Sequence, residues 1–392
     1  MSLRARLTNY ANGEGALLLD GGLATQLEAQ GAKLQGDPLW SARLLDTDPQ
    51  AISDAHHIFL SSGADIITTA TYQATIQGFV RHLNVSLDAA GELLVSGLHL
   101  AKQTVAAYVS DANGKACPLV AASVGPYGAS LHDGSEYTGA YAKMMSVEEL
   151  KSWHRPQLEC LAAAGADLLA FETIPSPKEA EALVELLREL PNCDAWLSFS
   201  CKDGACLADG SPFGDGVRVA NRSTQLLAVG VNCCPPEWAE TLLESARSLK
   251  SPNMSWVVYP NSGEEWDAEQ GWRTSCGKSS IPALSHTWIK QGAALIGWMT
   301  RGFTSNSTRG RVGSLAECTE GLLSRGSRSD CRAETTFGRE RQRWTRTWKY
   351  NVKMMASGDI IYWKINSKYT RACTVMSPVR EKRVWVVAIN KQ

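Results

Sequence analysis

Polar side chains stand at the ends of short apolar runs throughout residues 1–297. In such a position a carboxylate can bind an ammonium group, and a thiolate can bind a soft metal ion. For any one of these side chains, a structural role is about as good an explanation as a functional one, because it can cap a following helix or pack in the core. A functional site is a better explanation of the whole set. In chain order the candidates are Asp20, Thr69, Thr71, Ser123, Glu172, Cys201, Cys233, Cys234 and Asn261.

The apolar runs that carry these side chains are continuous rather than alternating, which is typical of parallel strands buried on both faces. Amphipathic stretches separate them, one opened by Ser146 with Glu149 three residues on, another by Ser176-Pro177. About eight strand-helix units in roughly 300 residues predict an α/β fold of the (β/α)₈ TIM-barrel type, with its chemistry at the carboxyl ends of the strands. The expected strands are 16–22, 64–71, 119–126, 167–173, 195–201, 226–233, 255–261 and 293–297.

A doubly wound open sheet is the competing architecture. It would place a Gly-x-Gly-x-x-Gly turn after the first strand, whereas Gly21-Gly22 here leads into Leu-Ala-Thr. The barrel is therefore favoured.

Charge divides the chain at Gly297. The whole sequence has 39 Lys and Arg against 40 Asp and Glu, a net charge of −1. Residues 298–392 hold 13 Arg, 6 Lys and 7 acidic residues, so they carry +12 and residues 1–297 carry −13. We expect a barrel domain over 1–297 and a basic tail over 298–392, which is poorly ordered because it lacks a periodic apolar pattern.

Cysteine usage and the absence of apolar segments indicate the compartment. The chain has eleven cysteines without a Cys-x-x-Cys pair, which fits reduced thiols. No apolar h-region stands near Met1, and no run of about 18 apolar residues follows, so neither secretion nor a membrane span is indicated. We expect a soluble cytoplasmic protein with no membrane partner.

Six short motifs follow one another along the chain: Asp20–Thr25 (DGGLAT), Thr69-x-Thr71, Ser123–Pro126 (SVGP), Phe171–Thr173 (FET), Gly230–Cys233 (GVNC) and Tyr259–Glu264 (YPNSGE). In this order and spacing they resemble the homocysteine S-methyltransferases, and most closely the branch that uses S-methylmethionine. The resemblance covers residues 10–297, which makes it specific although each motif alone is weak.

The resemblance implies an enzyme that transfers a methyl group from a sulfonium donor, S-methylmethionine or S-adenosylmethionine, to homocysteine and so makes methionine. It implies a zinc ion held by one cysteine after the sixth strand, which matches Cys233, and by an adjacent pair after the eighth. Zinc would make homocysteine a thiolate, because coordination strips the proton from a thiol. The implied holders of the homocysteine amino group are Asp20 and Glu172, and the implied pocket lining is Thr69, Thr71, Ser123 and Asn261.

The sequence departs from the family's pattern after Gly297. The family's eighth strand ends in Gly-Gly-Cys-Cys, whereas Trp298, Met299 and Thr300 follow here. We therefore expect the last strand-helix unit of the barrel to be truncated or altered, so that the domain over 1–297 is incomplete at its C-terminal end. Because two of the three implied zinc ligands are missing, zinc binding is in doubt. The alternative function is a metal-poor pseudoenzyme or amino-acid-binding barrel, and we expect weak or no methyl transfer.

Other thiols are poor replacements for the missing pair. Cys234 follows the sixth strand rather than the eighth, and Cys318, Cys331 and Cys373 lie far apart in the tail. The abrupt change after Gly297 suggests an altered reading frame, a retained intron or a misjoined gene model.

The tail also combines basic and aromatic residues, which together can contact phosphates and stack on bases. Translation of unintended sequence would give the same composition, so a nucleic-acid partner is not favoured. The residues concerned are Arg339, Arg341, Arg343, Trp344, Arg346 and Trp348.

Overall fold

The computed structural model describes residues 2–7, 15–111, 116–261, 264–267, 271–274 and 281–299, together with four short strands between 354 and 384. The chain divides into two compact units, residues 1–327 and 328–392, and each is described by itself.

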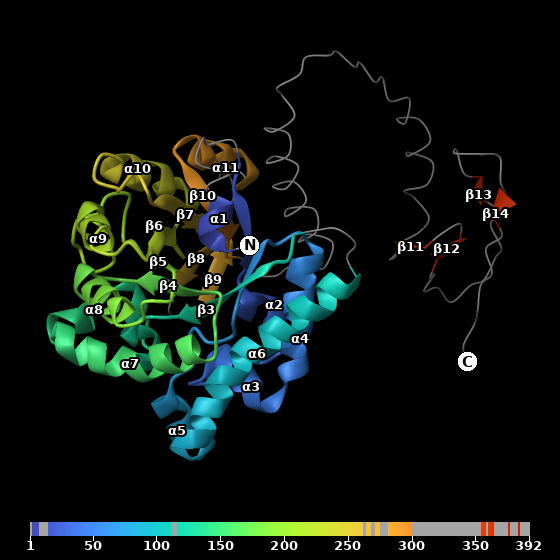
Figure 1. The fold of residues 1–392 in the computed structure, drawn as a ribbon, viewed down its shortest axis with the longest axis horizontal. Coiled ribbons are helices and arrows are strands. Elements are labelled where there is room, and N and C mark those ends of the chain that lie inside the picture. Colours follow the sequence, from blue (N-terminus) through green and yellow to red (C-terminus); the bar gives the residue numbers. More distant parts are fainter. Residues whose placement is uncertain are drawn as a thin grey trace, which may run out of the picture. The chain divides into compact units, whose positions relative to one another are not determined.

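Eight parallel strands close into a barrel in the first unit (Figure 1). Each lies within or overlaps one of the predicted runs, so the predicted (β/α)₈ barrel is confirmed. The strands are β1 (Leu17–Gly21), β2 (Ile66–Thr68), β3 (Leu119–Val124), β4 (Leu168–Ile174), β5 (Ala195–Phe199), β6 (Leu226–Asn232), β7 (Ser255–Tyr259) and β10 (Ala293–Trp298).

The barrel closes where the last strand meets the first. Strand β10 pairs with β1 in parallel, with Leu295 opposite Leu17 and Trp298 opposite Gly21. The eighth strand is therefore complete, even though the expected fold allowed for its truncation. Whether a helix follows it falls outside the described residues.

Helices surround the barrel on its outer side (Figure 1). Helices α2, α3, α4 and α6 lie together on one side of the barrel, and helices α7 to α11 follow around the rest of it in chain order. They are α2 (Leu23–Ala29), α3 (Leu44–Thr47), α4 (Pro49–Ser61), α5 (Ile76–Leu83), α6 (Leu87–Asp111), α7 (Val147–Ala163), α8 (Pro177–Arg188), α9 (Phe213–Ala220), α10 (Pro236–Ala246) and α11 (Ile281–Lys290).

The strands are apolar along their whole length because both of their faces are buried. In β4, Leu169 and Phe171 belong to the apolar cluster that the strands share with the helices. Their neighbours Leu168 and Ala170 belong to a second cluster, made almost entirely of strand residues, inside the barrel. Side chains alternate between the two faces of a strand, so both positions need apolar residues.

Helix α1 (Leu3–Leu7) closes the amino end of the barrel. Its Leu3 and Leu7 are buried in the inner cluster. Arg4 forms an ion pair with Asp194 at 2.6 Å and donates to the carbonyl of Thr224 at 3.1 Å, and both partners stand shortly before strands. With this end covered, the carboxyl ends of the strands remain for a site.

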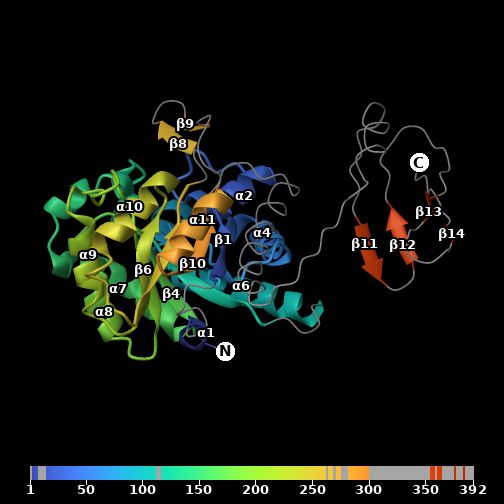
Figure 2. The same cartoon turned by 90° about the horizontal axis from the view of Figure 1, so that it is seen from above.

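Three antiparallel hairpins complete the described strands. One follows β7, and Figure 2 shows it at the end of the barrel opposite to α1. The other two lie in the second unit. The hairpins are β8 (Glu264–Asp267) with β9 (Gly271–Thr274), β11 (Met354–Ser357) with β12 (Ile360–Trp363), and β13 (Val375–Met376) with β14 (Arg383–Val384).

The predicted boundary at residue 297 and the predicted poor order of the tail stay predictions, since most of residues 300–392 are not described. The tail cysteines and the arginine-tryptophan segment also lie outside the described residues. Within the described part of the chain, no helix has the length and apolarity needed to cross a membrane.

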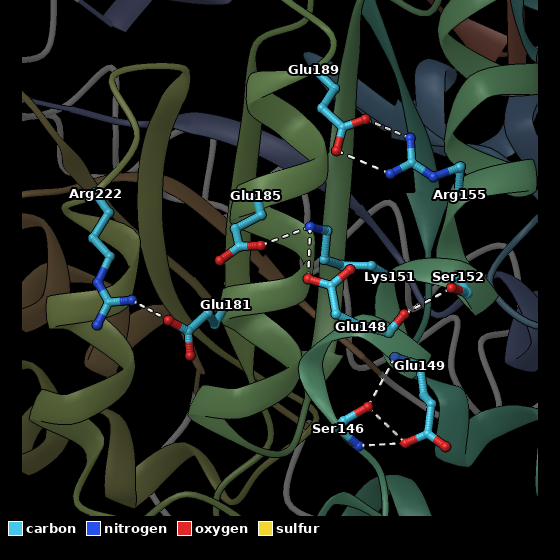
Figure 3. Close-up of polar contacts among 10 residues, drawn as sticks. All are labelled: Ser146, Glu148, Glu149, Lys151, Ser152, Arg155, Glu181, Glu185, Glu189 and Arg222. Atoms are coloured by element: carbon cyan, nitrogen blue, oxygen red, sulfur yellow. Dashed lines mark hydrogen bonds and ion pairs between the residues drawn. The ribbon is translucent and has the colours of Figure 1, made fainter.

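The predicted starts of α7 and α8 are both confirmed. Ser146 accepts a hydrogen bond from the Glu149 N–H at 3.2 Å, and the Glu149 carboxylate accepts one from the Ser146 N–H at 2.7 Å (Figure 3). The Ser176 hydroxyl caps α8, accepting from the Glu179 N–H at 3.2 Å, without the reciprocal bond. Lys151 of α7 also pairs with Glu185 of α8 at 2.8 Å (Figure 3).

Replacing Ser146 by Ala should lower the free energy of unfolding by about 1 kcal/mol, because the first turn of α7 loses its cap. Ser152→Ala on the same helix is the control. The Ser152 hydroxyl bonds only the Glu148 carbonyl, at 2.8 Å, so its loss should change stability little. Urea titrations of both variants measure the difference, and equal stabilities would contradict the capping role.

Candidate functional site

A cavity of about 580 Å³ lies at the carboxyl ends of the strands. Its lining comes from the ends of seven of the eight barrel strands, including the segment after β1, the end of β4 and the single residue Met299 after β10. This is the end of the barrel at which the sequence predicted the chemistry.

Five of the seven predicted site residues line this cavity. They are Thr69, Ser123, Glu172, Cys233 and Asn261. They come from five different strands, so the fold brings together residues that are up to 192 positions apart in the sequence.

Asp20 and Thr71 are not among the lining residues. The Asp20 carboxylate is buried and accepts hydrogen bonds from the Thr68 N–H at 2.7 Å and the Thr68 hydroxyl at 3.0 Å. The Thr71 hydroxyl is fully buried, donates to the Ser123 carbonyl at 2.7 Å and lies 2.6 Å from the Thr69 hydroxyl. Both residues therefore support neighbours that form the cavity wall.

Glu172 is the most buried acidic residue of the lining, 5% exposed. Its carboxylate accepts hydrogen bonds from the Ser123 hydroxyl and from the Tyr259 hydroxyl, the latter at 3.1 Å. Burial raises the pKa of Glu172 to about 7. Burial also raises the pKa of Asp20 to about 8, and the charge of Glu172 adds to that rise.

Tyr259 is a site residue whose role the sequence did not predict. Its hydroxyl accepts from the Trp196 indole N–H at 3.0 Å and lies 2.5 Å from the Ser198 hydroxyl. It thus links β5 and β7 to Glu172 through the interior of the barrel. The signal available in the sequence was only its place inside the predicted strand 255–261 and at the start of a motif.

Cys233 and Thr173 both have backbone φ angles in the left-handed region, +49° and +62°. This conformation is strained for non-glycine residues and most strained for a β-branched one. Fully buried Asn232 holds the pair, accepting from the Thr173 N–H at 2.8 Å and donating to the Thr173 hydroxyl at 2.7 Å and the Cys233 Sγ at 3.3 Å. Asn232 therefore positions the thiol, a role that sequence reasoning missed.

The surroundings of Cys233 keep its thiol protonated. Burial raises the pKa of Cys233 to about 12, and the nearby charge of Glu172 adds to the effect. The thiol lines the cavity rather than lying in packed hydrocarbon, and it shares that cavity with Glu172. The geometry thus keeps the predicted thiol and carboxylate together.

The donors near Cys233 do not form a three-ligand metal site. Among the described residues, no three His, Cys, Asp or Glu side chains come together as possible metal ligands. Cys234 is 1% exposed and belongs to the outer apolar cluster. At the end of β10, the Trp298 side chain is buried in the same cluster, and Met299, which follows the strand, lines the cavity.

The cavity wall is strongly acidic. Its described lining contains five carboxylates and neither Lys nor Arg, so the wall favours ligands with positive charge. The acidic residues are Glu28, Asp37, Asp133, Glu136 and Glu172.

Comparisons with known proteins confirm the resemblance predicted from the motifs. The sequence profile described as Homocysteine S-methyltransferase matches residues 17–297. Homocysteine S-methyltransferase 1 of Zea mays is 43% identical over 300 residues, which are 74% of this chain and 92% of that protein. Betaine-homocysteine S-methyltransferase of Drosophila melanogaster is 40% identical over 294 residues, 72% of this chain and 88% of that protein.

Solved structures agree with the barrel. The metallated form of the homocysteine methyltransferase MmuM from Escherichia coli matches with a TM-score of 0.67 and 37% identity, covering 76% of this chain and 96% of that chain.

Burial of Glu172 predicts that stability depends on pH. Since its folded pKa of about 7 lies above the ordinary value of 4.5, the folded state holds the proton more tightly, and stability is lost as pH rises from 4.5 through 7. Glu172→Gln should remove roughly 3 kcal/mol of that loss. Urea unfolding at pH 5 and pH 8 measures it, with the exposed Glu148→Gln as control. A wild-type protein whose stability rises over this range would contradict the burial argument.

Proposed function

Because the chain belongs to the homocysteine S-methyltransferase family, we propose that its barrel binds homocysteine and a sulfonium methyl donor and joins the methyl group to the homocysteine sulfur, which gives methionine. The observation that carries the proposal is the buried carboxylate of Glu172 in an acidic cavity that also exposes the Cys233 thiol. A carboxylate held in this way is suited to an ammonium group, which both substrates of the reaction carry.

Glu172 is the proposed partner of the homocysteine ammonium group. Ser123 and Tyr259 fix its two oxygens, so the carboxylate needs little reorganisation when a cation arrives. Asp20 belongs to the same proposal, because the charge of Glu172 adds to the rise in the Asp20 pKa, which places the two carboxyl groups near each other. Thr69 and Asn261 supply a hydroxyl and an amide for the polar end of the substrate.

The transfer itself is a displacement at carbon. The homocysteine thiol loses its proton to solvent, and the resulting thiolate attacks the methyl carbon. A new C–S bond forms while the bond from the methyl group to the sulfonium sulfur breaks. The leaving group is a neutral thioether, so no general acid is required. The protein's contribution is to hold the two sulfur atoms in line across the methyl group.

Zinc is the cofactor that the family resemblance implies, and the described residues do not fit it. A catalytic zinc site has three protein ligands, and a thiolate is among the ligands that zinc prefers. Cys233 offers one thiol, Cys234 is packed in the core, and Met299 after β10 offers a thioether. The described residues therefore do not supply a catalytic metal site for the transfer.

Without that activation the substrate thiol must ionise unaided. A free thiol has a pKa near 8.5, so only a few per cent is thiolate at pH 7. Slow transfer or none is the expected outcome. The second candidate function is therefore an amino-acid-binding barrel that keeps the carboxylate site without efficient catalysis, and the observation that favours it is the Trp298-Met299 pair at the end of β10.

A cytoplasmic location is part of the proposal. It rests on the seven cysteines in the described part of the chain, all of which are free thiols. No nucleic-acid partner is proposed, because the basic segment lies outside the described residues.

Homocysteine binding should strengthen as pH rises from 6 to 8, because the ammonium group binds the ionised form of Glu172, whose pKa is about 7. Calorimetric titration should show at least a tenfold loss of affinity in Glu172→Gln and little remaining pH dependence. Exposed Glu148→Gln should match the wild type. Affinity that falls over this pH range would argue against Glu172 as the partner.

Zinc content tests whether the chain holds a catalytic metal. The purified full chain should hold much less than one equivalent of zinc by elemental analysis and methylate homocysteine weakly or not at all. Replacing residues 298–392 with the family's Gly-Cys-Cys ending and closing helix should restore both. Adding Cys233→Ser to that chimera should remove zinc again. One tightly held zinc in the unaltered chain would contradict the donor-set argument.

A further inference from the structure

We propose that Glu136 recognises the α-ammonium group of the methyl donor and so selects amino-acid sulfonium donors over betaine. The residue lies on the short helix η4 (Ser135–Tyr137), in the segment that follows β3. The inference rests on the proposed methyl transfer, and it assigns a separate carboxylate to the second substrate.

The backbone of Glu136 is fixed by packing and hydrogen bonds. Its carbonyl accepts from the Ser200 hydroxyl at 2.7 Å, which ties η4 to the end of β5. A Cβ atom on Gly128 would lie 2.7 Å from the Glu136 nitrogen, so the loop leaves no room for a larger residue there. Main-chain contacts hold the residue in place, and its side chain is not needed for anchoring.

A buried carboxylate fixes the loop on either side of η4. Glu179, 0% exposed at the start of α8, accepts from the Tyr127 N–H at 2.7 Å and from the Tyr141 hydroxyl, and it lies 2.8 Å from His154 Nε2. Tyr127 stands before η4 and Tyr141 after it. The segment that carries Glu136 is therefore attached at both ends to the helix layer.

The Glu136 side chain lines the cavity, and one of its oxygens is left without a protein partner. Oε2 is buried and accepts no hydrogen bond from any described residue. Burial raises the pKa of Glu136 to about 7, which shows the cost of placing the unpaired charge there. An unpaired buried oxygen is costly, and a ligand in the cavity that donates a hydrogen bond would satisfy this one.

The groups around Glu136 do not neutralise it. Tyr72 and Tyr137 share the cavity wall, and burial raises the pKa of both phenols well above the usual value, so they stay uncharged. Burial lowers the pKa of His132, which favours its neutral form. Asp37 is already paired with Arg43 at 2.7 Å.

An unpaired oxygen in an acidic wall favours a cation that can donate a hydrogen bond. An α-ammonium group has N–H bonds to give to Oε2, whereas a sulfonium centre and the trimethylammonium of betaine have none. A sulfonium amino acid also carries one net positive charge, and betaine carries none. The acidic wall and the unpaired oxygen therefore favour the amino-acid donor, and they place the betaine carboxylate near like charge.

The test compares matched ligands on the full chain by calorimetric titration. S-methylmethionine carries the α-ammonium group, and dimethylsulfoniopropionate is a sulfonium acid without it. Glu136→Gln should weaken S-methylmethionine binding at least tenfold, and homocysteine and dimethylsulfoniopropionate binding should change less than threefold. Unchanged homocysteine binding also shows that the variant is folded.

Asp133→Asn is the matched control, because it removes one charge from the same wall. Asp133 is exposed, and its Oδ1 accepts from the Ser135 N–H at 2.9 Å, which an Asn oxygen can also do. Because Asp133 belongs to the same acidic wall, its variant should weaken S-methylmethionine binding modestly, by clearly less than the tenfold or more expected for Glu136→Gln. If both variants lost the same amount of S-methylmethionine affinity, the effect would come from the overall charge of the wall, and the proposal would be overturned.

Two further outcomes would overturn it. One is a wild-type chain that binds homocysteine but not S-methylmethionine. The other is a Glu136→Gln variant that loses both substrates equally, which would indicate a structural role. Failure of the wild type to bind homocysteine, with S-methylmethionine binding still dependent on Glu136, would instead overturn the proposed function and support this assignment.

Discussion

The site depends on holding the carboxylate of Glu172 inside the barrel, away from water. Water would stabilise the Glu172 carboxylate, and the fold replaces that water with the hydroxyls of Ser123 and Tyr259. Tyr259 is in turn held by Trp196 and Ser198, so the interior of the barrel serves as a hydrogen-bonding support for one side chain. This arrangement leaves the carboxylate ready for a cation and costs stability when none is bound.

The sequence predicts most of the fold because each strand needs apolar residues on both faces. Runs such as 167–173 therefore stand out, and the caps at Ser146 and Ser176 mark helix starts through contacts only three residues long. The closure of β10 onto β1 was predictable only from the count of strand-helix units, since no local pattern encodes a pairing over so long a distance.

The site was predictable in type and less so in detail. Residues at strand ends converge because the fold requires it, which accounts for Glu172 and Cys233. Asp20 stays a predicted partner of the substrate ammonium group, but its hydrogen bonds to Thr68 were not predictable, because the choice of partner depends on distances that residue spacing does not reveal. Asn232 was missed because its role arises from a strained backbone, and the role proposed for Glu136 depends on a loop that Glu179 of α8 holds.

The pairing of β10 with β1 has a consequence for biosynthesis. The first strand leaves the ribosome long before its neighbour exists, so its open edge stays unpaired until the segment ending at Trp298 has been made. Seven strands must wait in an incomplete cylinder during that interval, exposed to chaperones and to wrong partners. Closure of this seam is therefore the last pairing of the barrel that synthesis makes possible.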